Sequence, residues 1–151
     1  MRVSLGRESR HVVTSAEWLR SANDFPTGGL SLQTTYKSGS GTSWIYKPWF
    51  DPILGPALGC SLQPGSLNLW ADVPVALPGP ARAVIDGIEW LFVPLVVQGT
   101  EPAVAARKAS FGAIEFIEVF ACDHLASKLH LTLGDRVEVR LYSGEHLGLA
   151  A

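Results

Sequence analysis

Alternation of apolar and polar residues is the clearest pattern in this chain, and it predicts short β-strands. In residues 136–142, Val137, Val139 and Leu141 alternate with charged residues, as in a strand that buries one face. Residues 30–37 repeat the two-residue period, with leucine, threonine and tyrosine on one face. Further strands are expected at residues 81–86, 89–97, 102–107 and 114–121. The pattern therefore predicts a strand-rich fold.

Two segments between these strands show helix signals. Asp51, which precedes a proline, is typical of a helix N-cap, and we expect a helix from there toward Leu58. Asp123 is expected to cap a second helix, in which Leu125 and Leu129 lie four residues apart on one face. Both helices are short, so they are expected at the periphery of the strands.

Length and turn content favour a single small β-rich domain. The chain has 151 residues, with 15 glycines and 10 prolines that indicate many turns. Many short strands with two small helices favour a barrel over a doubly wound sheet. Residues 1–29 are expected to form an N-terminal extension, with a short helix from Thr14 or Ser15 to Asn23. Residues 30–151 then form the barrel domain.

Charge and hydropathy limit the partners. The formal net charge of −2 gives no general attraction to nucleic acid or to anionic membranes. No apolar run reaches the length of about 18 residues that indicates a membrane span. The first residues lack the apolar core of a secretory signal. We therefore expect a cytoplasmic monomer or small homo-oligomer that binds neither nucleic acid nor membranes.

The two cysteines, Cys60 and Cys122, form neither a metal-ligand pattern nor a disulfide framework. Each lies next to apolar residues, so we expect two small buried side chains in a reducing compartment. A bridge between them stays open at this stage.

A turn followed by a half-buried strand supplies the main chemical candidate. Pro64 and Gly65 mark a tight turn, after which Ser66 and Asn68 lie two residues apart on one face of a strand. Two neutral oxygens side by side are able to hold Mg²⁺, which keeps most of its waters and also takes phosphate oxygens. The alternative is that both side chains only satisfy backbone groups near the turn.

Aromatic residues are unusually dense at Trp44, Tyr46, Trp49 and Phe50. They are able to stack on a planar ring of a ligand. The alternative is that they pack in the core and around the mouth of the barrel.

The segment from Leu58 to Leu69 resembles the Leu-Gly-x-x-x-x-Pro-Gly-Thr-Leu-Asn signature of the CTP-dependent riboflavin kinases, a family known mainly from archaea. Residues 38–41, Ser-Gly-Ser-Gly, follow the first predicted strand as the Gly-rich loop of that family does. Residues 121–139 resemble the family's closing helix, Gly-Asp turn and last strand. The resemblance covers about residues 30 to 142.

This resemblance implies a mainly β fold, a small six-stranded cradle-loop-type β-barrel with short peripheral helices. It implies transfer of a phosphoryl group from CTP, or another nucleoside triphosphate, to the 5′-hydroxyl of riboflavin, which gives FMN. It implies Mg²⁺ bound by Ser66 and Asn68, and flavin contacts from Ser110 and Glu118, with Glu118 as the candidate catalytic base. The implied nucleotide-binding residues are Gly39, Ser40, Gly41, Thr42, Ser43, Trp44, Asp123, His124, Leu125 and Ala126.

The chain departs from the family pattern at charged and flexible positions. Thr42 and Ser43 replace the Glu-Gly that ends the family's loop, Gly-x-Gly-Glu-Gly. Ala126 and Ala109 stand where the family has arginines. These departures support an alternative function, a non-catalytic barrel that binds a nucleotide, a flavin or another small ligand.

Overall fold

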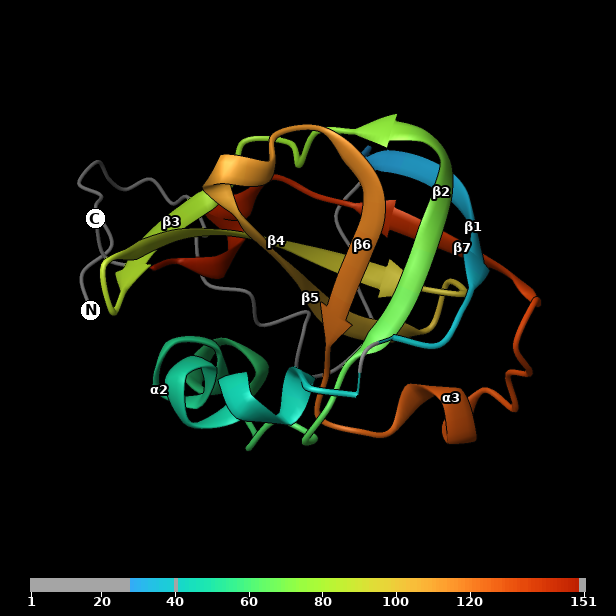
Figure 1. Ribbon diagram of the computed structural model, residues 1–151, viewed down its shortest axis with the longest axis horizontal. Helices are drawn as coiled ribbons and strands as arrows, with labels where there is room; N and C mark the ends of the chain where they lie inside the picture. Colours follow the sequence, from blue (N-terminus) through green and yellow to red (C-terminus); the bar gives the residue numbers. More distant parts are fainter. Residues whose placement is uncertain (1–27, 40, 150–151) are drawn as a thin grey trace.

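The structure is a computed structural model that describes residues 28–39 and 41–149, and it is mainly β (Figure 1). The strands are β1 Leu30–Tyr36, β2 Leu67–Val75, β3 Ala81–Ile85, β4 Ile88–Val97, β5 Glu101–Lys108, β6 Ile114–Phe120 and β7 Arg136–Leu141. The helices are α2 Lys47–Leu58 and α3 Leu125–Lys128, with short 3-10 helices η1 Ser43–Tyr46, η2 Ala109–Phe111 and η3 Gly144–Leu147. The helix expected within residues 14–23 lies outside the described residues.

Six strands close into an antiparallel barrel in the order β4-β5-β6-β2-β1-β7, and β7 pairs back with β4. Closure depends on the length of β4. Its first half pairs with β3 as a hairpin arm, and its second half pairs with β7 through registers such as Leu95 opposite Leu141. Because a closed barrel leaves its strands without free edges, every barrel strand has two neighbours. The expected six-stranded barrel with short peripheral helices is therefore confirmed.

Side chains that alternate inward along the strands fill the barrel. Thr34 is fully buried on the inward face of β1, and its hydroxyl donates a hydrogen bond to the Val137 carbonyl at 2.8 Å. Aliphatic side chains make up nearly all of the remaining interior. The buried strand residues of this inner core are Leu67, Leu69, Ala71, Val75, Val93, Leu95, Val97, Ala103, Ala105, Ile117, Val119, Val137, Val139 and Leu141. The alternation of apolar and polar residues in the sequence thus corresponds to the alternation of inward and outward side chains along the barrel strands.

A second core lies on the outer face of β4, β5 and β6, where α2 covers it (Figure 1). Phe50 of α2 is fully buried and makes edge-on ring contacts with Phe92 and Phe120 at centroid distances of 5.3 and 5.1 Å. Ala106 and Val104 of β5 pack in the same cluster. β4 and β5 are therefore buried on both faces over much of their length, which explains their continuous apolar runs, and β6 contributes Phe120 to this core.

Both expected helices form, but their N-caps differ from the expectation. Helix α2 begins at Lys47 with Pro48 in its first turn, so Asp51 lies inside the helix. The Asp51 carboxylate instead accepts hydrogen bonds from Lys47 Nζ and from the Leu62 amide, both at 2.7 Å. Helix α3 is capped by His124, whose side chain accepts from the Ser127 amide. Among the described residues no helix is long and apolar enough to cross a membrane.

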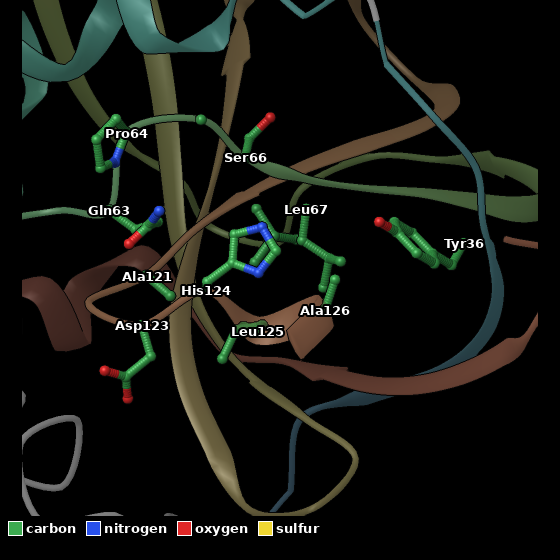
Figure 2. A pocket seen from close by; sticks show the side chains of 12 residues that line it. Tyr36, Gln63, Pro64, Ser66, Leu67, Ala121, Asp123, His124, Leu125 and Ala126 are labelled. Atoms are coloured by element: carbon green, nitrogen blue, oxygen red, sulfur yellow. The ribbon is translucent and has the colours of Figure 1, made fainter. Parts of the chain in front are cut away.

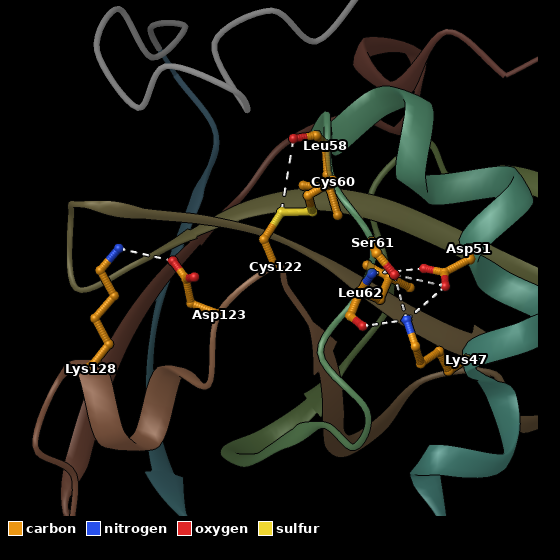
Figure 3. Close-up of a disulfide and its surroundings, with 9 residues drawn as sticks. All are labelled: Lys47, Asp51, Leu58, Cys60, Ser61, Leu62, Cys122, Asp123 and Lys128. Carbon is orange, nitrogen blue, oxygen red and sulfur yellow. Dashed lines mark hydrogen bonds and ion pairs between the residues drawn. A yellow bond between two sulfur atoms is a disulfide. The ribbon is translucent and has the colours of Figure 1, made fainter.

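The cysteines are bonded to each other, so the expectation of two separate buried thiols is wrong (Figure 3). Cys60 follows α2 and Cys122 follows β6, and their Cα atoms are 5.9 Å apart. The two cysteines are 62 residues apart in the sequence, so their contact could not be predicted from local patterns. It arises because β6 ends beside the end of α2. The disulfide therefore ties α2 to the segment that leads into α3.

Replacing Cys60 and Cys122 by serine is expected to lower the free energy of unfolding by about 4 kcal/mol, because the bridge closes a long loop in the unfolded chain. Urea unfolding measures the change, and circular dichroism checks that the barrel persists. A reducing agent should destabilise the parent protein and leave the double variant unchanged. Equal stability of the parent and the double variant would contradict a formed bridge.

Asp51→Asn is expected to cost about 1 kcal/mol of stability at neutral pH, because a charge-assisted contact with Lys47 is lost. Burial raises the pKa of Asp51, but hydrogen bonds from Lys47 and the Leu62 amide outweigh it and hold the pKa below its usual value of 3.8. A lowered folded-state pKa gives stability that is present above pH 3.8 and is lost as the pH falls through the folded pKa. The difference between Asp51→Asn and parent should therefore shrink in acid, as measured by urea unfolding from pH 7 to pH 2. A constant difference would contradict it.

Candidate functional site

A cavity of about 360 Å³ lies on the outer face of the barrel, between η1 and strands β2, β4, β5 and β6. We call it the larger cavity. One part of its wall is aromatic and consists of Tyr46, Trp70, Trp90, Phe111 and Phe116. Another part is polar and consists of Ser38, Gly39, Thr42, Ser43, Asn68 and Glu118. Such a cavity suits a ligand that joins a planar ring to a hydroxylated chain.

Strand register brings the polar residues together. Asn68 of β2 lies directly opposite Glu118 of β6, and both side chains point outward because their neighbours Leu69 and Ile117 fill the inner core. Ser66 immediately precedes β2, and its Oγ lies 3.2 Å from Asn68 Oδ1 and 3.0 Å from Glu118 Oε2. Because alternate residues of a strand point to the same face, the Asn68 amide and the Glu118 carboxylate lie together outside the barrel, next to the Ser66 hydroxyl.

Ser43 completes this group from the other side of the cavity. It begins η1, and its Oγ donates to Glu118 Oε2 at 2.6 Å and lies 2.7 Å from Ser66 Oγ. We call Ser43, Ser66, Asn68 and Glu118 the oxygen cluster. Three chain segments that are far apart in sequence contribute to it, so the cluster depends on the tertiary fold.

The Asn68 side chain packs directly against the backbone of Gly39. A Cβ at position 39 would overlap the Asn68 amide nitrogen and would lie 2.7 Å from Asn68 Cγ. The backbone of the same loop is fixed to β2, because the Lys37 amide donates to the Asn68 carbonyl at 3.1 Å. Glycine is thus required at position 39 by space, since the Asn68 amide occupies the place of a side chain.

The oxygen atoms fit a small hard cation. Oxygens on adjacent corners of an octahedron around Mg²⁺ are about 3 Å apart, given bond lengths of about 2.1 Å. The distances of 3.0 and 3.2 Å from Ser66 Oγ to Glu118 and Asn68 are hydrogen-bond lengths in this structure, and they are compatible with this spacing. No group of three histidine, cysteine, aspartate or glutamate side chains is placed to hold a metal within residues 28–39 and 41–149. Hydroxyl, amide and carboxylate oxygens are donors that Mg²⁺ takes together with waters or phosphate.

A second cavity, of about 90 Å³, lies on the α3 side of Ser66 (Figure 2). We call it the smaller cavity. Its wall includes Tyr36, Gln63, Leu67 and the segment 123–126 that begins α3. Ser66 lines the smaller cavity and Asn68 lines the larger one. Their oxygens are 3.2 Å apart, so the two cavities lie on either side of the oxygen cluster, although they share no lining residue among those that the structure describes.

His124 is fixed within the smaller cavity by its role in α3. Its Nδ1 accepts from the Ser127 amide at 3.2 Å and lies 2.7 Å from Ser127 Oγ. Nδ1 is thus engaged in the helix cap, and His124 lines the smaller cavity (Figure 2). Asp123 lies one residue before the capping position and pairs with Lys128 at 3.0 Å (Figure 3).

Two cations line the larger cavity. Arg107 is 4% exposed, and its guanidinium donates to the carbonyls of Val75, Gly112, Ile114 and Phe116. Burial lowers the pKa of Arg107, but an arginine keeps its charge in proteins. Lys108 Nζ lies 5.7 Å from the Trp90 ring centroid. Within the described part of the chain, no lysine or arginine lines the smaller cavity.

The residues expected to bind nucleotide or flavin divide between the two cavities. Gly39, Thr42, Ser43 and Glu118 line the larger cavity. Asp123, His124, Leu125 and Ala126 line the smaller cavity. Neither cavity is lined by Gly41, Trp44 or Ser110, and Trp44 is 60% exposed. Ser40 lies outside the described residues.

Sequence reasoning missed Trp90 and Phe116 as wall residues of the larger cavity. Each lies in a strand with several apolar residues, where an aromatic side chain is usually predicted to be buried in a core. Their outward orientation follows from register, since Trp90 pairs with Lys108 and Phe116 pairs with Trp70. The spacing of Phe116 and Glu118, two residues apart in β6, could have indicated that both side chains point outward on one face.

No protein-family model matches this chain, and a search of curated proteins gives no match either. The case for function therefore depends on the geometry of the two cavities and on the sequence motifs.

Gly39→Ala is expected to cost about 1–3 kcal/mol of stability, because the added methyl group overlaps the Asn68 amide. In a protein that already carries Asn68→Ala, the same change should cost much less, since the space is then open. Urea unfolding of the parent, both single variants and the double variant measures this coupling. Additive effects of the two substitutions would show that Gly39 and Asn68 are not in close contact.

Proposed function

We propose that this protein is a riboflavin kinase-like phosphotransferase, which moves a phosphoryl group from CTP or another nucleoside triphosphate to the 5′-hydroxyl of riboflavin. The observation that carries the proposal is the oxygen cluster of Ser43, Ser66, Asn68 and Glu118, which lies between two neighbouring cavities. A transferase for two substrates needs such an arrangement, with the reacting ends of both substrates at a shared point.

The larger cavity fits the flavin. Its volume of about 360 Å³ is in the range of small-molecule sites. Trp70 and Phe116, with ring centroids 5.2 Å apart, offer apolar surface to a planar ring system. Asn68 and Glu118 line the same cavity, so a ribityl chain leading from the ring would end at the oxygen cluster. This direction is the one that phosphorylation at the 5′-hydroxyl requires.

The smaller cavity is the proposed nucleotide side. A volume of about 90 Å³ holds only part of a nucleotide, so the remainder would extend beyond this cavity. Ser66 lies on its wall, and the segment that begins α3 lies opposite (Figure 2). The resemblance of both segments to the kinase motifs supports the same assignment.

Ser66 and Asn68 are the proposed ligands of Mg²⁺, and Glu118 lies within reach of the same point. The ion would neutralise negative charge on the transferred phosphate. Glu118 would accept the proton of the 5′-hydroxyl as that oxygen bonds to the γ-phosphorus and the bond to the β-phosphate oxygen breaks, which releases CDP when the donor is CTP. Ser43, which now donates to Glu118, would orient this carboxylate. The main work of the protein is then to position the two substrates.

A non-catalytic binding barrel is the second candidate function. One observation favours it: the Ser43 hydroxyl contacts both Glu118 and Ser66, at 2.6 and 2.7 Å, at the point where phosphate would lie. A second is the lack of a lysine or arginine on the described wall of the smaller cavity. Such a protein would bind flavin or nucleotide without turnover.

The test is formation of FMN from riboflavin, Mg²⁺ and each nucleoside triphosphate in turn, followed by chromatography. The parent protein is expected to form FMN. Asn68→Ala is expected to lower kcat at least about 100-fold, because the ion acts on the phosphates in the transition state, and to change riboflavin affinity less than about 3-fold. Asn68→Asp is the matched control, since it keeps an oxygen ligand and should retain more activity than the alanine variant.

Two results would count against the kinase. A parent protein that binds riboflavin but forms no FMN with any triphosphate would leave the binding barrel as the function. Parental turnover in Asn68→Ala, with an unchanged melting temperature, would show that Ser66 and Asn68 hold no ion.

A further inference from the structure

The Cys60–Cys122 disulfide joins two walls of the smaller cavity. The first wall is residues 63–67, which begin shortly after Cys60. The second wall consists of Ala121 and residues 123–126, which flank Cys122 on both sides. The bridge therefore connects the chain at the edge of each wall (Figure 3).

Most of both walls lies beyond the ladder of β2 and β6, which reaches Leu67 opposite Val119. Past this point the Gln63 amide donates a hydrogen bond to the Ala121 carbonyl at 2.8 Å, and the disulfide follows. A backbone hydrogen bond at the end of a sheet opens by local fluctuation, whereas a covalent bond does not. The disulfide is therefore the contact that keeps the two walls at a fixed separation.

Each wall is also anchored to a different part of the fold. Leu62, just before the first wall, is tied to α2, because its amide donates to Asp51 and its carbonyl accepts from Lys47, both at 2.7 Å. Leu125 of the second wall is 5% exposed and lies in the inner core of the barrel. Without the disulfide, the first wall would stay attached to α2 and the second to the barrel, and the two would be free to move apart.

A small reductant is able to reach the disulfide, because both cysteines are only half-buried. A dithiol reduces the bridge in two exchanges. One of its thiolates attacks a bridge sulfur and forms a mixed disulfide, and its second thiolate then displaces the bound cysteine. The dithiol leaves as a cyclic disulfide, and Cys60 and Cys122 take up the two protons that it gave up.

We propose that Cys60 and Cys122 are a positioning pair for the ligand of the smaller cavity, so that reduction of their bond weakens binding there and spares the larger cavity. Walls that are fixed in advance lose less conformational freedom when a ligand binds. The larger cavity is lined mainly by barrel strands and by η1, whose Tyr46 packs against Trp90 of β4. Occupancy of the smaller cavity then depends on the redox state of the surroundings.

This inference rests on the proposed function only in taking a nucleotide as the ligand of the smaller cavity, so the first readout uses no ligand. Hydrogen exchange of the Gln63 amide reports the contact between the walls, since this amide donates to Ala121. The Gly144 amide, which donates to the Gly79 carbonyl at 2.8 Å in another part of the fold, is the control. Dithiothreitol is expected to raise the exchange rate of Gln63 about 10-fold or more relative to that of Gly144.

Calorimetry then measures the affinities of the oxidised parent, the dithiothreitol-reduced parent and the Cys60→Ser/Cys122→Ser variant for CTP with Mg²⁺ and for riboflavin. Reduction is expected to weaken CTP binding about 10-fold or more and riboflavin binding less than about 3-fold, and reoxidation should restore both. The double variant is the matched control, because it should resemble the reduced parent and should not respond to dithiothreitol. A thermal melt confirms that each sample is folded before the affinities are compared.

An unchanged exchange rate of Gln63 on reduction would overturn the inference. Equal weakening of CTP and riboflavin would also overturn it, since a general loss of structure affects both ligands. A parent protein that binds no CTP would refute the nucleotide assignment of the proposed function, and the exchange of Gln63 would then decide the positioning role alone. Disulfide-dependent binding of CTP without formation of FMN would refute the kinase and support the positioning role.

Discussion

The burial of Phe50 between α2 and the barrel is the interaction on which the site depends. Phe50 is fully buried. Its ring contacts those of Trp90, Phe92 and Phe120 edge-on, at centroid distances of 5.0 to 5.3 Å. Tyr46 stacks on it from the other side at 5.5 Å. Full burial of a phenylalanine contributes about 2–3 kcal/mol. This contact fixes η1 and α2 over the strands, and therefore fixes one wall of the larger cavity.

The site lies where the outer core stops. Along β6, Phe120 is in the outer core, while Glu118 and Phe116 continue the same face into the larger cavity. Along β5, Ala106 packs in the outer core, and Lys108, two residues later on the same face, lines the larger cavity. The oxygen cluster thus stands at the edge of a rigid apolar layer. In the proposed transferase, rigid support of this kind would hold the groups of the oxygen cluster in position before the substrates react.

Alternation in the sequence predicted most of the fold, because strands buried on one or both faces require apolar side chains at fixed positions. It predicted β1 and β7 and approximate bounds for β4, β5 and β6. The closed barrel came from the resemblance, since closure is a property of strand order that local patterns do not contain. Helix caps failed because the helices begin elsewhere: α2 begins at Lys47, so Asp51 lies inside it, and α3 is capped by His124 rather than Asp123.

The candidate site was predictable in part. The spacing of Ser66 and Asn68 indicated two oxygens on one face, and the structure places them 3.2 Å apart. The contacts of Glu118 with Ser43 and Ser66 depend on register between distant segments, and only the resemblance pointed to Glu118. The disulfide was beyond sequence reasoning, because it depends on which side chains the finished fold brings together.

The most direct measurement of the central claim is a crystal structure with riboflavin, Mg²⁺ and a non-hydrolysable CTP analogue bound together. We expect the flavin ring in the larger cavity beside Trp90, the phosphates and the ion at Ser66 and Asn68, and the nucleoside at the segment 123–126. The ribityl 5′-oxygen should then lie close to Glu118 and in line with the γ-phosphate. Phosphates bound away from Ser66 and Asn68, or a flavin outside the larger cavity, would contradict the account.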